Sequence, residues 1–307
     1  MLATIAFHAD EVRQAIIEST SPALLAIVTP FLTLPLVGVR IAACRLVRAL
    51  SRSVATLRTS LVDAGVGEQL LELLHDDGAE YEVRLEVIAA LCNMALKHSP
   101  MHELVLQSGG VKRLVSFLDD ASPSTSSSSL PEGRRRSGAL DGVMAHNVLW
   151  ALKNITCGAS LDVKRAVGSA LGWDRLHAYA LDNDAAIQEQ ALNIIRNLAA
   201  LAVPDIEMTV EALGLQRLLD LLESVIWTRR GPVVPTPDGE GWPVERETER
   251  ERERVDGSVL VLVQAANILV NLATGSRHVR MAMLQRPNLL DAILFFLVMS
   301  SFSSPRC

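Results

Sequence analysis

Four asparagines stand in matching apolar segments of this 307-residue chain, each followed two positions later by a small residue. They are Asn93, Asn154, Asn197 and Asn271. An asparagine amide both donates and accepts hydrogen bonds, so a row of such side chains can hold the main chain of an extended peptide. The same amide can instead satisfy backbone groups between neighbouring helices. The pattern therefore indicates either a recognition surface or a set of structural links, and the sequence leaves both interpretations open.

The residues beside these asparagines could complete a recognition surface. Trp150 lies four positions before Asn154, which puts the two on one helix face, so the ring could pack against an aliphatic stem while the amide holds a backbone. The alternative role for Trp150 is packing between repeats, and the alternative for the neighbouring basic residues is a solvated helix face. The candidate partner-binding residues are Asn93, Trp150, Lys153, Asn154, Asn193, Arg196, Asn197, Asn267 and Asn271.

Other kinds of chemistry find no support in the residue patterns. The chain has no phosphate-binding glycine loop, no His-Glu-x-x-His helix and no serine in a nucleophile elbow. His98 and His102 have a metal-like spacing, but Pro100 between them breaks the helix that the geometry needs. We therefore predict a protein that is not an enzyme, with no catalytic, cofactor-binding or metal site.

The spacing of the asparagines indicates a repeat. Asn154 and Asn197 are 43 positions apart, and the two longer gaps each contain an insert, 121–139 and 224–256. The first insert is rich in Ser, so we expect it to be disordered. The second is rich in Pro, Gly, Arg and Glu, so we expect it to be disordered or charged, and the alternating acidic and basic residues of 245–254 favour a short, exposed helical run within it. Without them the spacing returns to about 42 residues, within the range of helical repeats. Two further copies of the segment have Ala49 and Thr4 at the place of the asparagine, which we call the Asn place.

Each unit shows three helical pieces in the same order. A short helix is followed by a glycine break, such as Ala64-Gly65 or Ser108-Gly109-Gly110, then an amphipathic helix, then the long helix that carries the Asn place. Long helices are predicted near residues 1–8, 39–53, 82–97, 143–157, 185–200 and 258–274. Three helices per unit resemble the armadillo repeat. The resulting prediction is an all-α, right-handed armadillo solenoid of five to six repeats over residues 1–307.

Within armadillo proteins, two resemblances point to function. Trp150 and Asn154 match the Trp-x-x-x-Asn element of importin-α, the adaptor for nuclear import signals, in which such residues line a concave groove. The other asparagines lack the preceding tryptophan, and Lys153 and Arg196 add positive charge, so an acidic or neutral extended peptide is a better ligand than a basic one. A β-catenin-like scaffold is a further alternative.

The second resemblance is more particular. Trp150 to Thr156, Ser160 to Arg165, Leu171-Gly172-Trp173 and Gln190 to Leu198 are similar to the Vid28-like armadillo subunit of GID/CTLH ubiquitin ligases. That resemblance implies a non-catalytic scaffold that links a substrate receptor to a catalytic RING core. It also implies a hetero-oligomeric complex with other protein subunits.

Composition and termini suggest the compartment. No secretory signal opens the chain, the apolar stretch 289–298 is too short to span a bilayer, and the four cysteines are scattered. We expect a cytoplasmic or nuclear protein. A net charge of −6 argues against nucleic acid or an acidic membrane as a partner. Because the last helix is apolar, we also expect a section of a longer array or an end that a partner covers, and a wrongly predicted gene end is the alternative.

Overall fold

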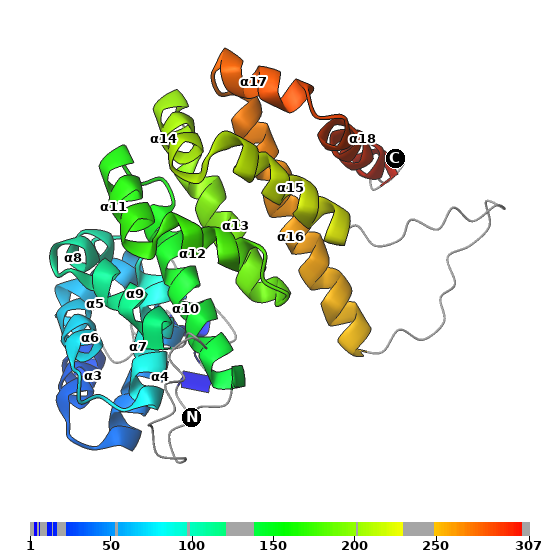
Figure 1. Ribbon diagram of the computed structural model, residues 1–307. Helices are drawn as coiled ribbons and strands as arrows, with labels where there is room; N and C mark the ends of the chain where they lie inside the picture. Colours follow the sequence, from blue (N-terminus) through cyan, green and yellow to red (C-terminus); the bar gives the residue numbers. More distant parts are fainter. Residues whose placement is uncertain are drawn as a thin grey trace, which may run out of the picture. The chain divides into compact units, whose positions relative to one another are not determined.

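The computed structural model describes residues 3–4, 6, 11–13, 15–16, 23–52, 55–96, 99–120, 138–200, 202–229 and 249–302. Throughout these ranges the ordered elements are helices, and no strand occurs among them. The chain divides into two compact units, residues 1–159 and 160–307, each built from consecutive helices (Figure 1). The division falls directly after a long helix, between two repeats, so each unit keeps whole repeats together.

The first unit contains two complete three-helix repeats, preceded by the helix pair α3 and α4. The elements are α3 (Ala23–Thr33), α4 (Val37–Leu50), α5 (Ala55–Asp63), α6 (Val66–His75), α7 (Tyr81–Met94), α8 (Met101–Gln107), α9 (Gly110–Asp120) and α10 (Gly138–Thr156). The long helices α4, α7 and α10 pack in succession, and so do the second helices α3, α6 and α9. This stacking puts the Asn places of successive repeats on neighbouring helices.

The second unit also contains two complete repeats, followed by α17 and α18. Its elements are α11 (Leu161–Leu171), α12 (Trp173–Ala180), α13 (Ala185–Leu198), α14 (Val203–Leu213), α15 (Leu215–Arg229), α16 (Glu249–Ala273), α17 (Arg277–Leu284) and α18 (Pro287–Phe302). The long helices α13 and α16 pack against each other, as do the second helices α15 and α18. The same arrangement thus recurs in both units.

Local sequence signals explain where the helices start. Gly65 and Gly109 separate the first and second helices of their repeats at φ of 76° and 75°, a left-handed conformation that glycine adopts without a steric penalty. Ser160, Asp184 and Ser276 cap α11, α13 and α17, because their side-chain oxygens accept hydrogen bonds from the backbone N–H groups of the first turn. The predicted glycine breaks are therefore confirmed at Gly65 and Gly109.

The core is aliphatic and runs through the repeats. In α10, Val148, Leu149, Leu152 and Ile155 are fully buried, at spacings that place them on one broad face of the helix. Burial of one such side chain stabilises the fold by about 1.5–3 kcal/mol, so four from one helix outweigh any single polar contact described below. Aliphatic packing fixes the helices, and the polar side chains are positioned by it.

The all-α prediction is confirmed for the part of the chain that the structure describes, but several boundaries differ from the expected ones. The predicted insert 224–256 is too wide, because α15 continues to Arg229 and α16 begins at Glu249. The predicted insert 121–139 overlaps α10, which begins at Gly138. Long helices predicted to end at 53, 97 and 200 end at Leu50, Met94 and Leu198. The remaining insert residues and most of the expected helix 1–8 lie outside the described residues.

Candidate functional site: the surface of the long helices

Three of the four asparagines that define the repeat bind the preceding long helix. The Asn93 Nδ2 donates to the carbonyl of Arg48, 3.0 Å away, and the Asn154 Nδ2 donates to the carbonyl of Cys92. In the second unit the Asn271 Nδ2 donates to the carbonyl of Arg196 at 3.1 Å. Each acceptor belongs to the residue directly before the Asn place of the preceding repeat. We call these three bonds the amide ladder.

Helix geometry explains why these carbonyls accept. The last four carbonyl groups of an α-helix have no N–H partner within the helix. Arg48, Cys92 and Arg196 fall within the last four residues of α4, α7 and α13. An asparagine from the next repeat therefore supplies a donor that the helix itself lacks. Each bond uses one of the two N–H groups of the amide, so the geometry describes a structural role without excluding a ligand.

The same interfaces contain a second, reciprocal contact. In each case the residue just before the Asn place of one repeat contacts a residue of the next repeat. That second residue lies seven positions before the Asn place of its own repeat. These contacts are Arg48 to Glu86 at 3.7 Å, the Cys92 Sγ donating to the Asn147 carbonyl at 3.2 Å, and Arg196 donating to the Gln264 Oε1 at 2.8 Å. The polar residue at this earlier place recurs in the sequence as Glu86, Asn147, Gln190 and Gln264, a signal that the sequence analysis missed.

The first helices also bind the ends of the long helices. The His102 imidazole hydrogen-bonds through Nε2 to the carbonyl of Ile155, in the last turn of α10. In the second unit the Lys164 Nζ donates to the Ala200 carbonyl at 2.7 Å and pairs with the Asp205 carboxylate at 3.1 Å. Lys164 is fully buried. Sequence patterns did not identify this pair, because the two residues are distant in sequence and each reads as an ordinary surface charge.

Trp150 lies half-buried on α10 with two polar neighbours from the same helix. The Lys153 Nζ lies 5.4 Å from the ring centroid, a cation–π contact, and the His146 ring meets the indole edge-on at 5.8 Å. Asn154 is buried one turn further along. The structure thus brings Trp150, Lys153 and Asn154 together on one helix, with Lys153 over the indole ring.

In the second unit, Asn193 and Arg196 each donate to a side chain of the same helix. The Asn193 Nδ2 donates to Glu189 at 3.1 Å, and Arg196 donates to the Oδ1 of Asn197 at 3.1 Å. Asn193 and Asn197 are buried, whereas Asn267 and Asn271 are half-buried. Of the nine candidates, the more accessible ones are Asn93, Trp150, Lys153, Arg196, Asn267 and Asn271.

Buried thiols in the first unit serve packing. Burial raises the pKa of the Cys44 and Cys92 thiols to about 12 each, so both remain protonated at neutral pH. A protonated Cys92 can donate to the Asn147 carbonyl, as its position requires. Neither thiol has the low pKa of a catalytic cysteine.

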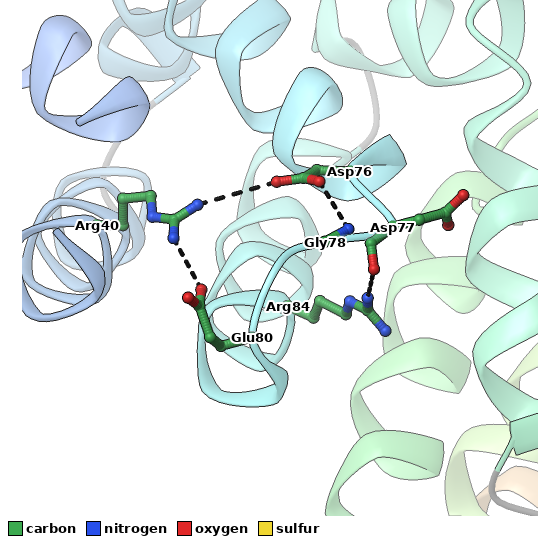
Figure 2. A network of polar contacts seen from close by, with 6 residues as sticks. All are labelled: Arg40, Asp76, Asp77, Gly78, Glu80 and Arg84. Carbon is green, nitrogen blue, oxygen red and sulfur yellow. Dashed lines mark hydrogen bonds and ion pairs between the residues drawn. The ribbon is translucent and has the colours of Figure 1, made fainter. Parts of the chain in front are cut away.

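Arginines join the second helices and the adjoining turns at more exposed positions. Figure 2 shows Arg40 of α4 between the carboxylates of Asp76 and Glu80, at 3.9 and 2.8 Å, with Arg84 donating to the carbonyl of Asp77. Further along, arginines reach the preceding second helix in each unit. These contacts are Arg113 to the Leu74 carbonyl, Arg217 to Asp174 and Arg286 to Asp220.

The described residues also bear on metal binding and on membrane insertion. No group of three or more His, Cys, Asp or Glu side chains there could hold a metal ion. Within the same ranges, no helix is both long and apolar enough to cross a membrane.

Comparison with solved structures identifies the architecture. A designed armadillo repeat protein is similar with a TM-score of 0.58 and 21% identity, over 86% of this chain and 90% of that one. A second designed armadillo repeat protein, solved in complex with the peptide (KR)4, has a TM-score of 0.58 and 20% identity, over 85% and 89% of the two chains. The armadillo-type, all-α solenoid expected from the sequence is thereby confirmed.

Comparison of sequences identifies the family. Residues 37–212, more than half of the chain, match the model of the VID28/GID5 C-terminal domain. GID complex subunit 5 of Schizosaccharomyces pombe is 28% identical over 72% of this chain and 25% of its own length. Armadillo repeat-containing protein 8 of Danio rerio is 30% identical over 70% of this chain and 28% of its own length. The chain spans about a quarter of the length of the curated relatives it matches. The repeats, the recurring segments around the Asn places and this match together establish that the chain belongs to the VID28/GID5 C-terminal domain family.

Proposed function

We propose that this chain is a non-catalytic protein-binding scaffold and a subunit of a GID-type ubiquitin ligase, in which it links a substrate receptor to the catalytic core. The observation that carries the proposal is the family match over residues 37–212, which includes the long helices α4, α7, α10 and α13. One matched relative is named as a GID complex subunit. A stack of helices whose polar side chains bind neighbouring helices suits a scaffold, because repeat architectures present extended surfaces to partners.

Within that role we propose that the accessible side chains on the long helices of the first unit hold an extended segment of the substrate receptor. Trp150 offers apolar area there, and Lys153 on the same helix favours a segment that is acidic or neutral. Because the Lys153 ammonium of this chain already lies over the indole ring, a ligand lysine there would meet a like charge at close range. This contact argues against a basic nuclear import signal as the ligand.

The amide ladder changes how this proposal is tested. Replacement of Asn154 removes a structural donor from the interface of α7 and α10, so it would mix loss of stability with loss of binding. Trp150→Ala together with Lys153→Glu alters the accessible surface and leaves the ladder intact. Lys112→Glu, an exposed position on α9, is the control with the same charge change.

The experiment is affinity purification of the tagged chain, followed by reconstitution with the RING and CTLH-motif subunits and a substrate receptor. We expect the RING and CTLH-motif subunits to copurify, and the receptor to be retained by the Lys112→Glu control and lost from the double variant. Recovery of importin-β in their place would support an importin-like adaptor and refute the ligase proposal. Equal receptor binding by both variants would refute the surface but not the scaffold role.

Cytoplasmic or nuclear localisation is part of the same proposal. Fluorescence imaging of the tagged chain at endogenous expression tests it, and a secretory pattern would contradict it.

A further inference from the structure

Two arginines of α4 share one carboxylate of α7 in the first unit. The Arg45 Nε binds the Glu86 Oε1 at 2.7 Å, and the Arg48 Nη1 lies 3.7 Å from the Glu86 Oε2. The Glu86 side chain is only 12% exposed, whereas those of Arg45 and Arg48 are 60% and 36% exposed. Because one carboxylate cannot neutralise two guanidinium groups, positive charge remains at this surface.

Glu86 also holds Arg45 in place. Within the described residues the Arg45 side chain has Glu86 as its one polar partner, and that contact uses Nε. The two Nη groups therefore remain at the exposed end of the side chain. A guanidinium group that is fixed at one nitrogen can bind a carboxylate through two parallel N–H groups at little further entropic cost. Arg45 is thus oriented in advance for a ligand carboxylate.

A second source of positive charge lies on the other side of α7, which packs against both α4 and α10. Lys153 of α10 directly precedes Asn154, just as Arg48 of α4 directly precedes Ala49 at the Asn place. Burial raises the pKa of the Cys92 thiol of α7, and the charges of Lys153 and Arg48 oppose that rise. Both cations therefore lie close enough to Cys92 to act on it, and α7 has positive charge on each side.

The part of α7 between these cations presents small or uncharged side chains. Ala89 stands four positions before the Asn place, where α4 has Arg45 and α10 has Trp150. Asn93 is half-buried and gives one N–H to the preceding helix, so its second N–H and its Oδ1 can bind the main chain of a ligand. The exposed carboxylate of Glu82 lies in the first turn of α7, at the opposite end of the helix from Asn93.

We infer that this surface selects an extended segment with two carboxylates about five residues apart, one bound by Arg45 and Arg48 and the other by Lys153. Small uncharged residues lie between the two carboxylates, over α7. Packed helices lie about 8–10 Å apart, so α4 and α10, with α7 between them, are about 16–20 Å apart. An extended chain spans about 3.3–3.6 Å per residue, so about five residues bridge that distance. The inference rests on the proposed function, because it specifies the receptor segment that the first unit holds.

Two labelled peptides of identical composition test the spacing. In the spaced peptide two glutamates are separated by four serine and alanine residues, and in the adjacent peptide the two glutamates are neighbours. Binding to the full chain is measured by fluorescence anisotropy. We expect the spaced peptide to bind with a Kd below about 1 mM and at least about fivefold more tightly than the adjacent one. A general attraction of the surface for anions would treat both peptides alike, so equal affinities would overturn the inference.

Two variants assign the ends of the segment. Arg45→Gln and Lys153→Gln should each weaken binding of the spaced peptide about five- to tenfold. Lys112→Gln, at an exposed position of α9, makes the same charge change and should leave the affinity unaltered. When one peptide glutamate is replaced by glutamine, one variant should lose its effect while the other keeps it. If either replacement removes both effects, the two cations do not bind separate carboxylates and the inference is wrong.

A phosphorylated partner is the alternative occupant. Saturable binding of a peptide with phosphoserine at both glutamate positions, together with no binding of the spaced glutamate peptide, would assign the surface to that partner and overturn the inference. The receptor reconstitution separates this inference from the proposed function. A receptor that is retained by the parent chain, with equal binding of the two glutamate peptides, would refute the charge spacing alone. A receptor that is not retained, with preference for the spaced peptide, would refute the receptor role alone.

Discussion

The polar links between repeats differ between the second helix of each repeat and its first and third helices. The first and third helices use buried or half-buried contacts, namely the amide ladder and the ion pair of Lys164 with Asp205. At the second helices, arginines bind carboxylates that are largely exposed, as in Arg217 with Asp174 and Arg286 with Asp220. Both sets join neighbouring repeats, but their surroundings differ.

This difference indicates which links hold each repeat in alignment with the next. A buried donor or acceptor without a partner costs its full desolvation free energy. A shift of one repeat along the next would leave such groups without partners, so the buried links oppose it. Exposed ion pairs exchange protein contacts for water at little cost. We therefore expect the register of the array to depend on the long and first helices, with the second helices tolerant of change.

The largest expected effect comes from the buried ion pair. Lys164→Met leaves the Asp205 carboxylate buried without its counter-charge and removes the donor to the Ala200 carbonyl, at a cost of about 3–5 kcal/mol. Urea unfolding with hydrogen exchange of α11 and α14 measures it. The double variant Lys164→Met with Asp205→Leu should recover most of the lost free energy of unfolding. If it is no more stable than the single variant, an unpaired buried carboxylate is not the cause of the loss.

The amide ladder should show the next largest effect. Asn154→Ala leaves the buried Cys92 carbonyl without its donor and should destabilise the first unit by about 1–3 kcal/mol. Asn93→Ala should cost less, because Asn93 is half-buried and water can replace its amide. Denaturant unfolding gives the two values, with Asn288→Ala on the exposed side of α18 as the control. If Asn93→Ala costs more than Asn154→Ala, burial is not what sets the strength of the ladder.

A smaller effect is expected at the surface. Arg286→Ala removes contacts to Gln216, Asp220 and Glu223, of which Asp220 is largely exposed. Because water can replace the contact to Asp220, the loss should be about 0–1 kcal/mol. Thermal unfolding in low and high salt measures it, and the difference between variant and parent should shrink as salt rises. A loss as large as that of Asn154→Ala would remove the distinction between the two kinds of link.

The smallest effect concerns pH. The hydrogen bond from Arg217 lowers the pKa of the exposed Asp174 carboxyl below its ordinary value of 3.8. A lowered folded-state pKa gives stability that is present above the unfolded-state pKa and is lost as pH falls through the folded-state pKa. Arg217→Met should return the Asp174 pKa toward its ordinary value in an NMR titration, with little change in stability at pH 7. An unchanged pKa would show that the pair does not form in solution.

The sequence predicted the repeats and their three-helix content because these depend on short-range patterns. Apolar spacing fixed the helices, and glycines such as Gly65 marked the breaks. The recurring Asn places gave the repeat length through the two inserts. The alternating charges of 245–254 indicated a helical run, but not that it is continuous with the long helix α16, which begins at Glu249, because such a segment has no apolar spacing that links it to the core.

What the sequence alone determined was that amides recur at one place in each repeat. What only the tertiary structure decided was which atoms they bind. The amide of Asn154 finds the Cys92 carbonyl, and Lys164 finds Asp205, because stacked helices bring together groups far apart in the chain. The cause is physical, since helix ends leave carbonyls unpaired and only the packing of the next repeat determines which side chain reaches them.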